Sequence, residues 1–324
     1  MRRLALLVLL GAILMGCGDR QGSAVVPLRV GVFLVQDFLP YYVIQEQGFD
    51  RRHGLRFTEQ SFLGGAAVMA AMAEGSLDMS PAVGTVPILS AAERGWIPEK
   101  MVAVAGNNVS DRNHPGIALF AANSISDWKD LRGKKIAVNA ADSITAAAVK
   151  VRLRQEGVVN YSLVAIPFSN MGLALAGGNV SAAGMNEPYL TQSQLRGDGH
   201  LMAWVAGGPP FEEMQFTVIL FSGPFHRGNP QAVKAYLRAH LAAVRWIDDH
   251  PREARLLLAK RLSLSRDVAE RVSLLRWPRD ARNSPELLEK MQRVLVSAEL
   301  LRAPIPKQRL YDEALLEEVL KERQ

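Results

Sequence analysis

Side chains and glycines that could hold a small ligand follow the ends of predicted strands. Carboxylates and hydroxyls there could exchange hydrogen bonds with a solute, and glycines let backbone N–H groups approach it. In open α/β sheets, ligands lie beyond the carboxyl ends of the strands, so we expect these residues to line one binding cleft. The set is Asp37, Phe38, Tyr41, Gly64, Gly65, Gly84 and Thr85 in the first part of the chain, and Asp142, Ser143, Thr145, Asn186, Glu187 and Tyr189 in the second.

Several members of this set also have ordinary structural explanations, which the sequence leaves open. Phe38 fits a core position, and Gly64-Gly65 fits a tight turn. Asp142 or Ser143 could serve only as the N-cap of the helix that follows. The sequence therefore predicts a cleft without separating ligand contacts from structural residues at these positions.

Residues arranged for catalysis or metal binding are missing from the sequence. Cys17 is the only cysteine, and the six histidines are scattered without the spacing of metal ligands. The chain contains no GxxxxGK[ST] phosphate loop, no GxSxG elbow and no HExxH pair. We therefore expect a protein that is not an enzyme, with no metal site and no cofactor.

The acidic residues of the set favour a ligand that carries a nitrogen group. A carboxylate about 4 Å from an anion costs on the order of 4 kcal/mol near a protein surface, whereas a helix N-terminus contributes roughly 0.3–1 kcal/mol. If Asp142 and Glu187 face the cleft, a zwitterion, an amine-bearing heterocycle or a neutral solute is favoured over nitrate. If they turn outward, a sulfonate remains possible. No basic residue stands at the strand ends, which points the same way.

Alternating apolar runs and helical stretches predict the elements that position these residues. Two successive rounds of strands and helices predict an α/β fold with mostly parallel strands, and a strand at Ile117–Phe120 closes the first round. The expected elements include strands at Leu28–Phe33 and Lys135–Asn139 and helices at Tyr41–Arg52, Ser143–Gln155 and Pro230–His250. Met72–Asp78 and Leu175–Ser181 share one arrangement of helix end, glycine and strand start, which predicts two lobes of similar design. After a returning strand at Met214–Phe221, the rest of the chain is predicted to be helical.

The first 17 residues have the composition of a secretory signal. Arg2 and Arg3 precede an apolar run, Leu4–Ile13, that is too short to span a bilayer, and Leu-Met-Gly-Cys follows. The segment resembles a bacterial lipoprotein signal in which Cys17 is lipidated; an ordinary secretory signal is the alternative. We expect a protein of the cell envelope, on the periplasmic or extracytoplasmic face, anchored to the membrane through lipidated Cys17.

The length and charge of the mature chain favour two lobes and argue against binding of nucleic acid. Removal of residues 1–16 leaves 308 residues and lowers the net charge from +6 to +4, because Arg2 and Arg3 are lost. Both signs of charge are interleaved, so the sequence lacks the basic stripe of a nucleic-acid-binding protein. A chain of this length exceeds one comfortable core.

Short segments occur in the order found in periplasmic solute-binding proteins of ABC importers. They are Leu28–Phe33, Met72–Asp78, Gly84–Pro87, Ile125–Ala137, Leu175–Tyr189 and Pro230–Ala254. The chain thus resembles the group that binds nitrate, sulfonates, taurine and pyrimidine precursors of thiamine. The resemblance implies a two-lobed type II periplasmic-binding-protein fold, in which each lobe is a mostly parallel sheet flanked by helices, with a helical C-terminal extension.

The resemblance also implies a division of the chain and a set of partners. The division is 1–16 as signal peptide, 17–27 as tether, 28–121 plus 216–324 as lobe 1 with the C-terminal helices, and 122–215 as lobe 2. Hinges near 120–123 and 211–216 would let the lobes close on a ligand without chemistry. The implied partners of this monomer are a small-molecule ligand and the permease and ATPase subunits of an ABC importer.

Two other functions remain open at this level. The fungal synthase of the thiamine pyrimidine shares the implied fold, but its family pattern includes a cysteine-rich iron motif that this chain lacks. An extracytoplasmic sensor or scaffold lipoprotein with no transport role fits the same sequence, and Asn107-Asn108 or the loop Gly207–Pro210 could contact a partner.

Overall fold

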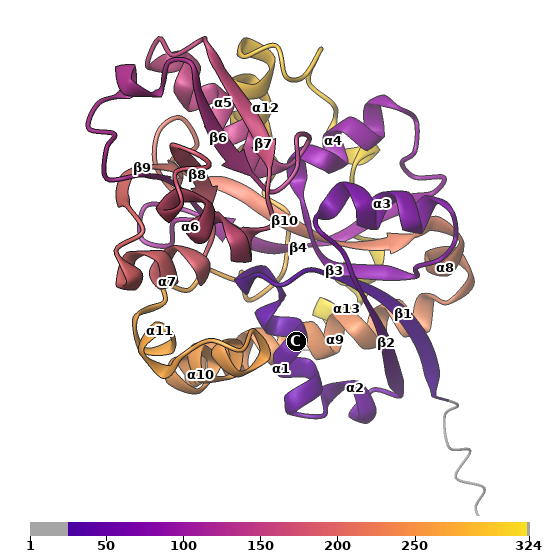
Figure 1. Ribbon diagram of the computed structural model, residues 1–324. Coiled ribbons are helices and arrows are strands. Elements are labelled where there is room, and N and C mark those ends of the chain that lie inside the picture. Colours follow the sequence, from indigo (N-terminus) through magenta and orange to yellow (C-terminus); the bar gives the residue numbers. More distant parts are fainter. Residues whose placement is uncertain (1–24, 323–324) are drawn as a thin grey trace, which may run out of the picture.

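Residues 25–322, which the computed structural model describes, form two five-stranded sheets with helices packed around them (Figure 1). The predicted signal segment and Cys17 lie outside the described residues. The first sheet has the order β2-β1-β3-β10-β4, with strands β1 (Val26–Val32), β2 (Leu55–Ser61), β3 (Met79–Gly84), β4 (Met101–Ser110) and β10 (Met214–Ser222). β1 is parallel to β2 and β3, whereas β10 is antiparallel to β3 and β4.

The second sheet repeats this design. It has the order β7-β6-β8-β5-β9, with strands β5 (Ile117–Ala121), β6 (Lys134–Val138), β7 (Tyr161–Ala165), β8 (Ala182–Met185) and β9 (His200–Ala206). β6 is parallel to β7 and β8, and β5 is antiparallel to β8 and β9. Each sheet therefore holds one strand that runs against its neighbours: β10 in the first and β5 in the second.

The position of β5 differs from the predicted division of the chain. That division puts residues up to 121 in lobe 1, but β5 pairs with β8 and β9 of the second sheet. The chain crosses between the sheets before Ile117, and it crosses back between β9 and β10. An apolar run predicts a strand, but its sheet is chosen by partner strands far away in the sequence.

Helices that begin near the ends of strands follow the predicted pattern closely. They are α3 (Gly65–Ala73), α4 (Thr85–Glu93), α5 (Ile144–Gln155), α6 (Phe168–Ala176) and α7 (Tyr189–Arg196). One predicted helix, over 41–52, is instead two, α1 (Leu39–Glu46) and α2 (Phe49–Arg52). The chain turns at Gly48, whose φ of 66° lies in the left-handed region that glycine adopts without a steric penalty.

The C-terminal part is mostly helical, as predicted, and it packs on the first sheet and against helices of the second half. Its helices are α8 (Gly223–Gly228), α9 (Pro230–Asp249), α10 (Pro251–Arg261), α11 (Arg266–Arg271), α12 (Pro285–Ser297) and α13 (Ala314–Lys321). α9 contacts α1 and α13, whereas α12 touches β10 and also α5 of the other half. Residues 272–284 lack helix. Within 25–322, helices long and apolar enough to cross a membrane are absent.

Candidate functional site

A small cavity lies between the two sheets, where strands of both end and helices begin. Its volume is about 30 Å³, which is room for little more than a water molecule. The wall combines residues from the ends of β1, β3, β6 and β8 with residues from the starts of α3 to α6 and from β10: Phe33, Asp37, Gly65, Gly84, Pro87, Asn139, Ser143, Ile144, Thr145, Phe168, Asn186, Phe216 and Thr217. This is the place at which α/β sheets hold ligands.

About half of the sequence-predicted residues meet in this wall. Those that line it are Asp37, Gly65, Gly84, Ser143, Thr145 and Asn186. Gly64 lies next to it, because a Cβ atom at that position would be 3.1 Å from Nδ2 of Asn139. Tyr189 lines a separate recess that shares Phe33 and Phe168 with the cavity.

Three predicted residues of the first half of the chain make structural contacts outside the cavity wall. The Tyr41 hydroxyl donates to Oε1 of Glu59 at 3.1 Å. Thr85 Oγ1 donates to the backbone oxygen of Gln215 at 2.7 Å, which ties α4 to β10. The ring of Phe38 packs edge-on against Phe33 with centroids 4.8 Å apart, so Phe38 supports a cavity residue from behind.

The two acids expected in the second half turn away from the cavity. Asp142 is exposed. Glu187 is buried, and its carboxylate accepts hydrogen bonds from the backbone N and Oγ1 of Thr191 at 3.1 and 2.8 Å. Burial raises the pKa of Glu187, and the Thr191 bonds oppose this. Neither acid lines the cavity, so neither would repel a sulfonate there.

Asp37 is the acidic residue in the cavity wall, and half of its carboxylate is unpartnered. Its side chain is buried, and Oδ1 accepts a hydrogen bond from Nδ2 of Asn108 at 3.0 Å. Among the described residues, Oδ2 has no hydrogen-bond partner. Burial raises the pKa of Asp37 to about 6, opposed by the Asn108 bond. A buried oxygen of this kind is costly unless a donor pairs with it, so it favours a ligand N–H group.

Neighbouring side chains of β4 and β10 hold Asp37 in place. Asn107 Nδ2 donates to the backbone oxygen of Asp37 and to Thr217 Oγ1, each at 2.9 Å. Thr217 Oγ1 donates in turn to Asn108 Oδ1 at 2.8 Å. These strands carry the chain toward and back from the second sheet, so the Asp37 carboxylate is fixed to the connection between the two halves.

The starts of α3, α4, α5 and α6 supply the opposite charge at the same cavity. Residues of their first turns line it, and the exposed N–H groups of a helix start carry partial positive charge. Ser143 Oγ caps α5 by accepting from the backbone N of Ala146 at 3.0 Å. Within 25–322, α3, α4 and α6 have no side-chain cap. The wall thus presents an anion-attracting side and a carboxylate.

Two amides complete the polar part of the wall. The Oδ1 atoms of Asn139 and Asn186 are buried and have no hydrogen-bond partner among the described residues. An amide can present its oxygen or its nitrogen after rotation, so these groups suit either polarity. The electrostatic potential in the cavity is therefore determined by the Asp37 carboxylate and by the N-termini of the helices.

Several wall residues were missing from the predicted set: Phe33, Pro87, Asn139, Ile144, Phe168, Phe216 and Thr217. Asn139 ends the strand predicted at 135–139, so the strand-end rule could have found it. Phe33 and Phe168 look like core residues in the sequence. Phe216 and Thr217 lie inside the apolar run of β10, and only pairing of that strand between β3 and β4 brings them to the cavity.

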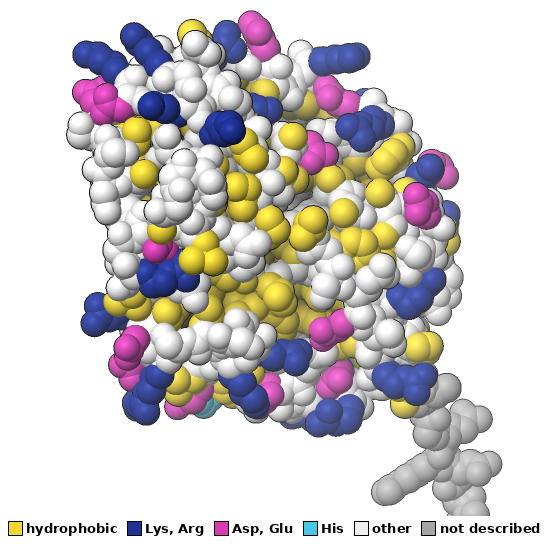
Figure 2. All heavy atoms as spheres, in the orientation of Figure 1, with side chains coloured by type: hydrophobic (Ala, Val, Ile, Leu, Met, Phe, Trp, Pro, Cys, Tyr) yellow, Lys and Arg dark blue, Asp and Glu magenta, His cyan; other side chains and the backbone are white. Residues whose placement is uncertain are grey.

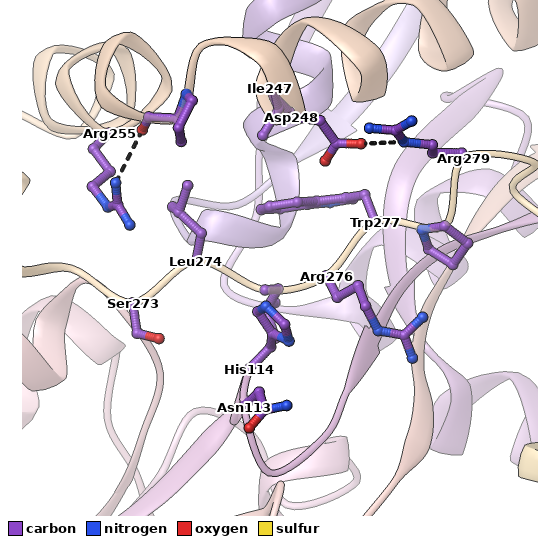
Figure 3. A pocket seen from close by; sticks show the side chains of 13 residues that line it. Asn113, His114, Ile247, Asp248, Arg255, Ser273, Leu274, Arg276, Trp277 and Arg279 are labelled. Atoms are coloured by element: carbon purple, nitrogen blue, oxygen red, sulfur yellow. Dashed lines mark hydrogen bonds and ion pairs between the residues drawn. The ribbon is translucent and has the colours of Figure 1, made fainter.

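A larger cavity of about 610 Å³ lies elsewhere, between the end of α9, the start of α10, the β4–β5 connection and the segment 273–279 (Figure 3). Its arginines already have partners. Arg279 Nε is 2.7 Å from Asp248, and Arg276 Nε is 2.9 Å from Asp111, which lies outside the cavity wall. Arg255 donates to the backbone oxygens of Val272 and Pro251. The indole N–H of Trp277 lacks an acceptor among the described residues. Most of the polarity of this cavity is thus already satisfied.

Groups of three or more histidine, cysteine, aspartate or glutamate residues that could hold a metal ion are absent from residues 25–322. The buried polar groups of the interlobe cavity are one carboxylate, amides and hydroxyls. Their arrangement is suited to hydrogen bonding of a solute.

Comparison with known proteins places the chain in a family. Residues 21–263, about three quarters of the chain, match the NMT1-like family. The chain belongs to the NMT1-like family. The predicted relationship to the nitrate- and sulfonate-type binding proteins is confirmed at this level. One relative by sequence is a candidate aliphatic sulfonates-binding protein of Bacillus subtilis strain 168. The two sequences are 24% identical over 278 residues, and the match covers 83% of this chain and 81% of the relative.

Solved structures share the fold of this NMT1-like protein. The alkanesulfonate-binding protein SsuA of Xanthomonas axonopodis, bound to MOPS, is 18% identical with a TM-score of 0.71, covering 86% of this chain and 95% of that one. The nitrate-binding protein NrtA of Synechocystis is 16% identical with a TM-score of 0.74, covering 93% and 89%. The predicted α/β fold of periplasmic binding proteins is confirmed.

An enzyme has the same fold. The desulfurization enzyme DSZB is 17% identical with a TM-score of 0.63, covering 92% of this chain and 99% of that one. Fold alone therefore does not separate binding from catalysis, and the function must be argued from the site.

Proposed function

We propose that this NMT1-like protein is the extracytoplasmic solute-binding component of an ABC importer, and that its interlobe cavity captures a small organosulfonate-type zwitterion bearing an amino group. The cavity of about 30 Å³ would widen for this ligand by movement of the two lobes about the predicted hinges. Names of relatives support the transport role, because SsuA, NrtA and the Bacillus protein are named for binding sulfonates or nitrate. The free carboxylate oxygen of Asp37, buried in a wall that also holds helix starts, carries the ligand assignment.

The charges of the wall decide between ligand classes. A simple anion gains from the helix starts but meets the Asp37 carboxylate, and at about 4 Å this repulsion is on the order of 4 kcal/mol. A zwitterion such as taurine avoids that cost, because its ammonium group pairs with Asp37 while its sulfonate group accepts from N–H donors. An amino-heterocycle of the thiamine-pyrimidine type would satisfy Asp37 and leave the helix starts unused.

The remaining parts of the proposal concern the lobes and the membrane. We place lobe 2 at residues 117–206, shifted from the predicted 122–215 to include β5, and lobe 1 in the flanking segments with the C-terminal helices. The predicted tether 17–27 is too long by two residues, because Val26 and Pro27 belong to β1 and pair with β2. A tether ending at residue 25 and lipidated Cys17 would hold the monomer beside its permease and ATPase. Mass spectrometry of the membrane-extracted protein, by the mass of two or three acyl chains on Cys17, tests the anchor.

A matched ligand pair tests the ligand assignment. Taurine and ethanesulfonate share the sulfonate, but only taurine has the amine. Charge-assisted hydrogen bonds contribute about 1.5–3 kcal/mol, so taurine should bind roughly 10- to 150-fold more tightly. Titration calorimetry of the Cys17→Ser protein measures both, with nitrate and an aminopyrimidine alongside. Equal or tighter binding of ethanesulfonate or nitrate contradicts the proposal, and tight binding of the aminopyrimidine alone replaces the sulfonate.

A further inference from the structure

Glu187 lies at a contact between the two lobes. It follows β8 of lobe 2 and precedes α7, which packs against α11 of the C-terminal part. The backbone oxygen of Glu187 accepts a hydrogen bond from the backbone N of Gln36, in lobe 1, at 3.4 Å. The Gln36 side chain accepts in turn from the backbone N of Leu275 at 3.2 Å. Glu187 therefore meets lobe 1 at a junction that ties the end of β1 to the segment before α12.

The carboxylate of Glu187 is a buried charge without a basic partner. Charged side chains on the face shown in Figure 2 lie mainly around a hollow between α3 and α6 that apolar side chains line. Glu187, in contrast, is only 4% exposed. Within 25–322 it forms no ion pair with a lysine, arginine or histidine. Burying a charge in this way costs free energy, and burial accordingly raises the pKa of this carboxyl.

The hydrogen bonds of this carboxylate come from both lobes. Thr191 donates through its backbone N and its Oγ1, and it belongs to the same lobe as Glu187. The backbone N–H of Ser273, in lobe 1, also lowers the pKa of the carboxyl. Separation of the lobes would keep the Thr191 bonds and move Ser273 and Gln36 away, so water could reach the carboxylate. The charge of Glu187 is therefore better tolerated in the open arrangement.

A bound ligand leaves this cost in place. Asp37 lines the interlobe cavity, whereas Glu187 does not. The ammonium group of a zwitterion would pair with Asp37 and would not reach the Glu187 carboxylate. Closure of the cleft thus buries the charge of Glu187 whether or not a ligand is present.

We propose that Glu187 is a positioning residue that opposes closure of the lobes: its carboxylate loses water when the cleft shuts, which shifts the ligand-free protein toward the open arrangement and speeds release of the ligand. This inference rests on the proposed function, because it requires two lobes that move about the predicted hinges. It adds a residue that controls how often they close without touching the ligand.

Glu187→Gln tests this inference, because it removes the charge and keeps the size of the side chain. The amide oxygen can accept from the backbone N of Thr191, and Thr191 Oγ1 can accept from the amide nitrogen. A fluorophore pair on Thr58→Cys in β2 and Ser162→Cys in β7, exposed positions in outer strands of the two sheets, reports the distance between the lobes. The Cys17→Ser protein has no other cysteine, so single-molecule energy transfer gives its closed-to-open ratio without ligand.

We expect Glu187→Gln to raise the closed-to-open ratio of the ligand-free protein about 5- to 30-fold. This is the fold-change for roughly 1–2 kcal/mol, within the range for burial of an unpaired polar group. Release of taurine, followed by stopped flow with the same fluorophore pair, should become slower. Glu74→Gln, which removes an exposed charge at the end of α3, is the matched control and should change neither.

Thr191→Val should change the ratio in the opposite direction. It removes the Oγ1 donor, which water replaces only in the open arrangement, so the closed-to-open ratio should fall severalfold. The fall should be smaller in the Glu187→Gln background, where no charge depends on that donor. A merely structural role for the two residues would lower the melting temperature without this dependence on the charge.

The outcomes separate this inference from the function beneath it. An unchanged or lower ratio in folded Glu187→Gln overturns the inference and leaves the proposed function intact. Should that variant fail to fold, an unchanged ratio in Thr191→Val overturns it. A single distance in every protein, with and without taurine, would show that the lobes do not move and would contradict both. If the ratio rises as expected but taurine binds neither protein, the inference stands and the ligand assignment is wrong.

Discussion

Two cavities of this protein, one at Trp277 and one between the sheets, differ in a way that bears on the ligand site. The cavity at Trp277 has about 610 Å³, but Arg279 and Arg276 in its wall already pair with Asp248, Asp111 and Glu213, and Arg255 donates to backbone oxygens. The interlobe cavity has about 30 Å³, yet its wall holds a carboxylate oxygen and two amide oxygens that have no hydrogen-bond partner among residues 25–322. Buried polar groups cost free energy until a partner satisfies them. Unsatisfied polarity, and not volume, marks the place that a ligand completes.

Substitution of Asp37 should have the largest effect on binding, because it removes the charged group that distinguishes the interlobe cavity from the cavity at Trp277. Asp37→Asn keeps an oxygen for the Asn108 bond but removes the charge that would pair with an ammonium group. We expect the affinity for taurine to fall about 10- to 150-fold and the preference over ethanesulfonate to disappear. Calorimetric titration of the variant with taurine and with ethanesulfonate measures both the affinity and the preference. An unchanged preference would mean that the amine does not contact Asp37.

The pH dependence of binding shows whether the ligand group that contacts Asp37 is positively charged. Asp37 has a pKa of about 6 in the folded protein and an ordinary value of 3.8, so the folded state binds more protons between these values. The contribution of Asp37 to the free energy of unfolding therefore falls as the pH rises through this window. An ammonium ligand needs the ionised form, so its affinity should increase about tenfold from pH 5 to pH 7.

A ligand without an amine provides the control for that profile. Ethanesulfonate meets less repulsion when Asp37 is protonated, so its affinity should decrease over the same pH range. Affinities of both ligands measured from pH 5 to pH 7.5 show whether the amine of taurine contacts ionised Asp37. Parallel slopes for the two ligands would contradict the role of Asp37, and Asp37→Asn should flatten both.

A smaller effect is expected from Gly84, where the two halves approach closely. A Cβ atom there would lie 3.2 Å from Cγ2 of Ile144 on α5, tighter than ordinary contact. Gly84→Ala should therefore hinder closure over the ligand and weaken binding about three- to tenfold. Gly228→Ala, which would meet nothing within 4 Å, is the control. Equal affinities of the two variants would show that closure tolerates the extra methyl group.

The smallest effect is expected at the larger cavity. Arg279 is 71% exposed and pairs with Asp248, and such surface pairs contribute about 0–1 kcal/mol to the free energy of unfolding. Arg279→Ala should change the affinity for taurine less than twofold. A large loss of binding would place a ligand or an allosteric contact at Trp277 and overturn the contrast between the cavities.

The sequence by itself determined most elements and their family. Apolar periodicity predicted strands such as β1 and β6 and helices such as α5 and α9 within a few residues, because local burial patterns repeat with the period of each element. Asp37, Gly84, Ser143 and Asn186, which the strand-end rule assigned to one cleft, lie in the wall of one cavity, and their role as ligand contacts stays a prediction. It also explains why Asn139, at the end of β6, could have been included.

Tertiary structure alone decided the rest. Strand pairing put β5 in the second sheet and carried Thr217 to the cavity, since partners distant in the sequence select each other only in the folded chain. Side-chain orientation separated Asp37, which faces the cavity, from Glu187, whose carboxylate bonds to Thr191, although both acids follow strand ends. A sequence shows which residue stands at a strand end, but the direction of its side chain depends on the neighbours that can satisfy it.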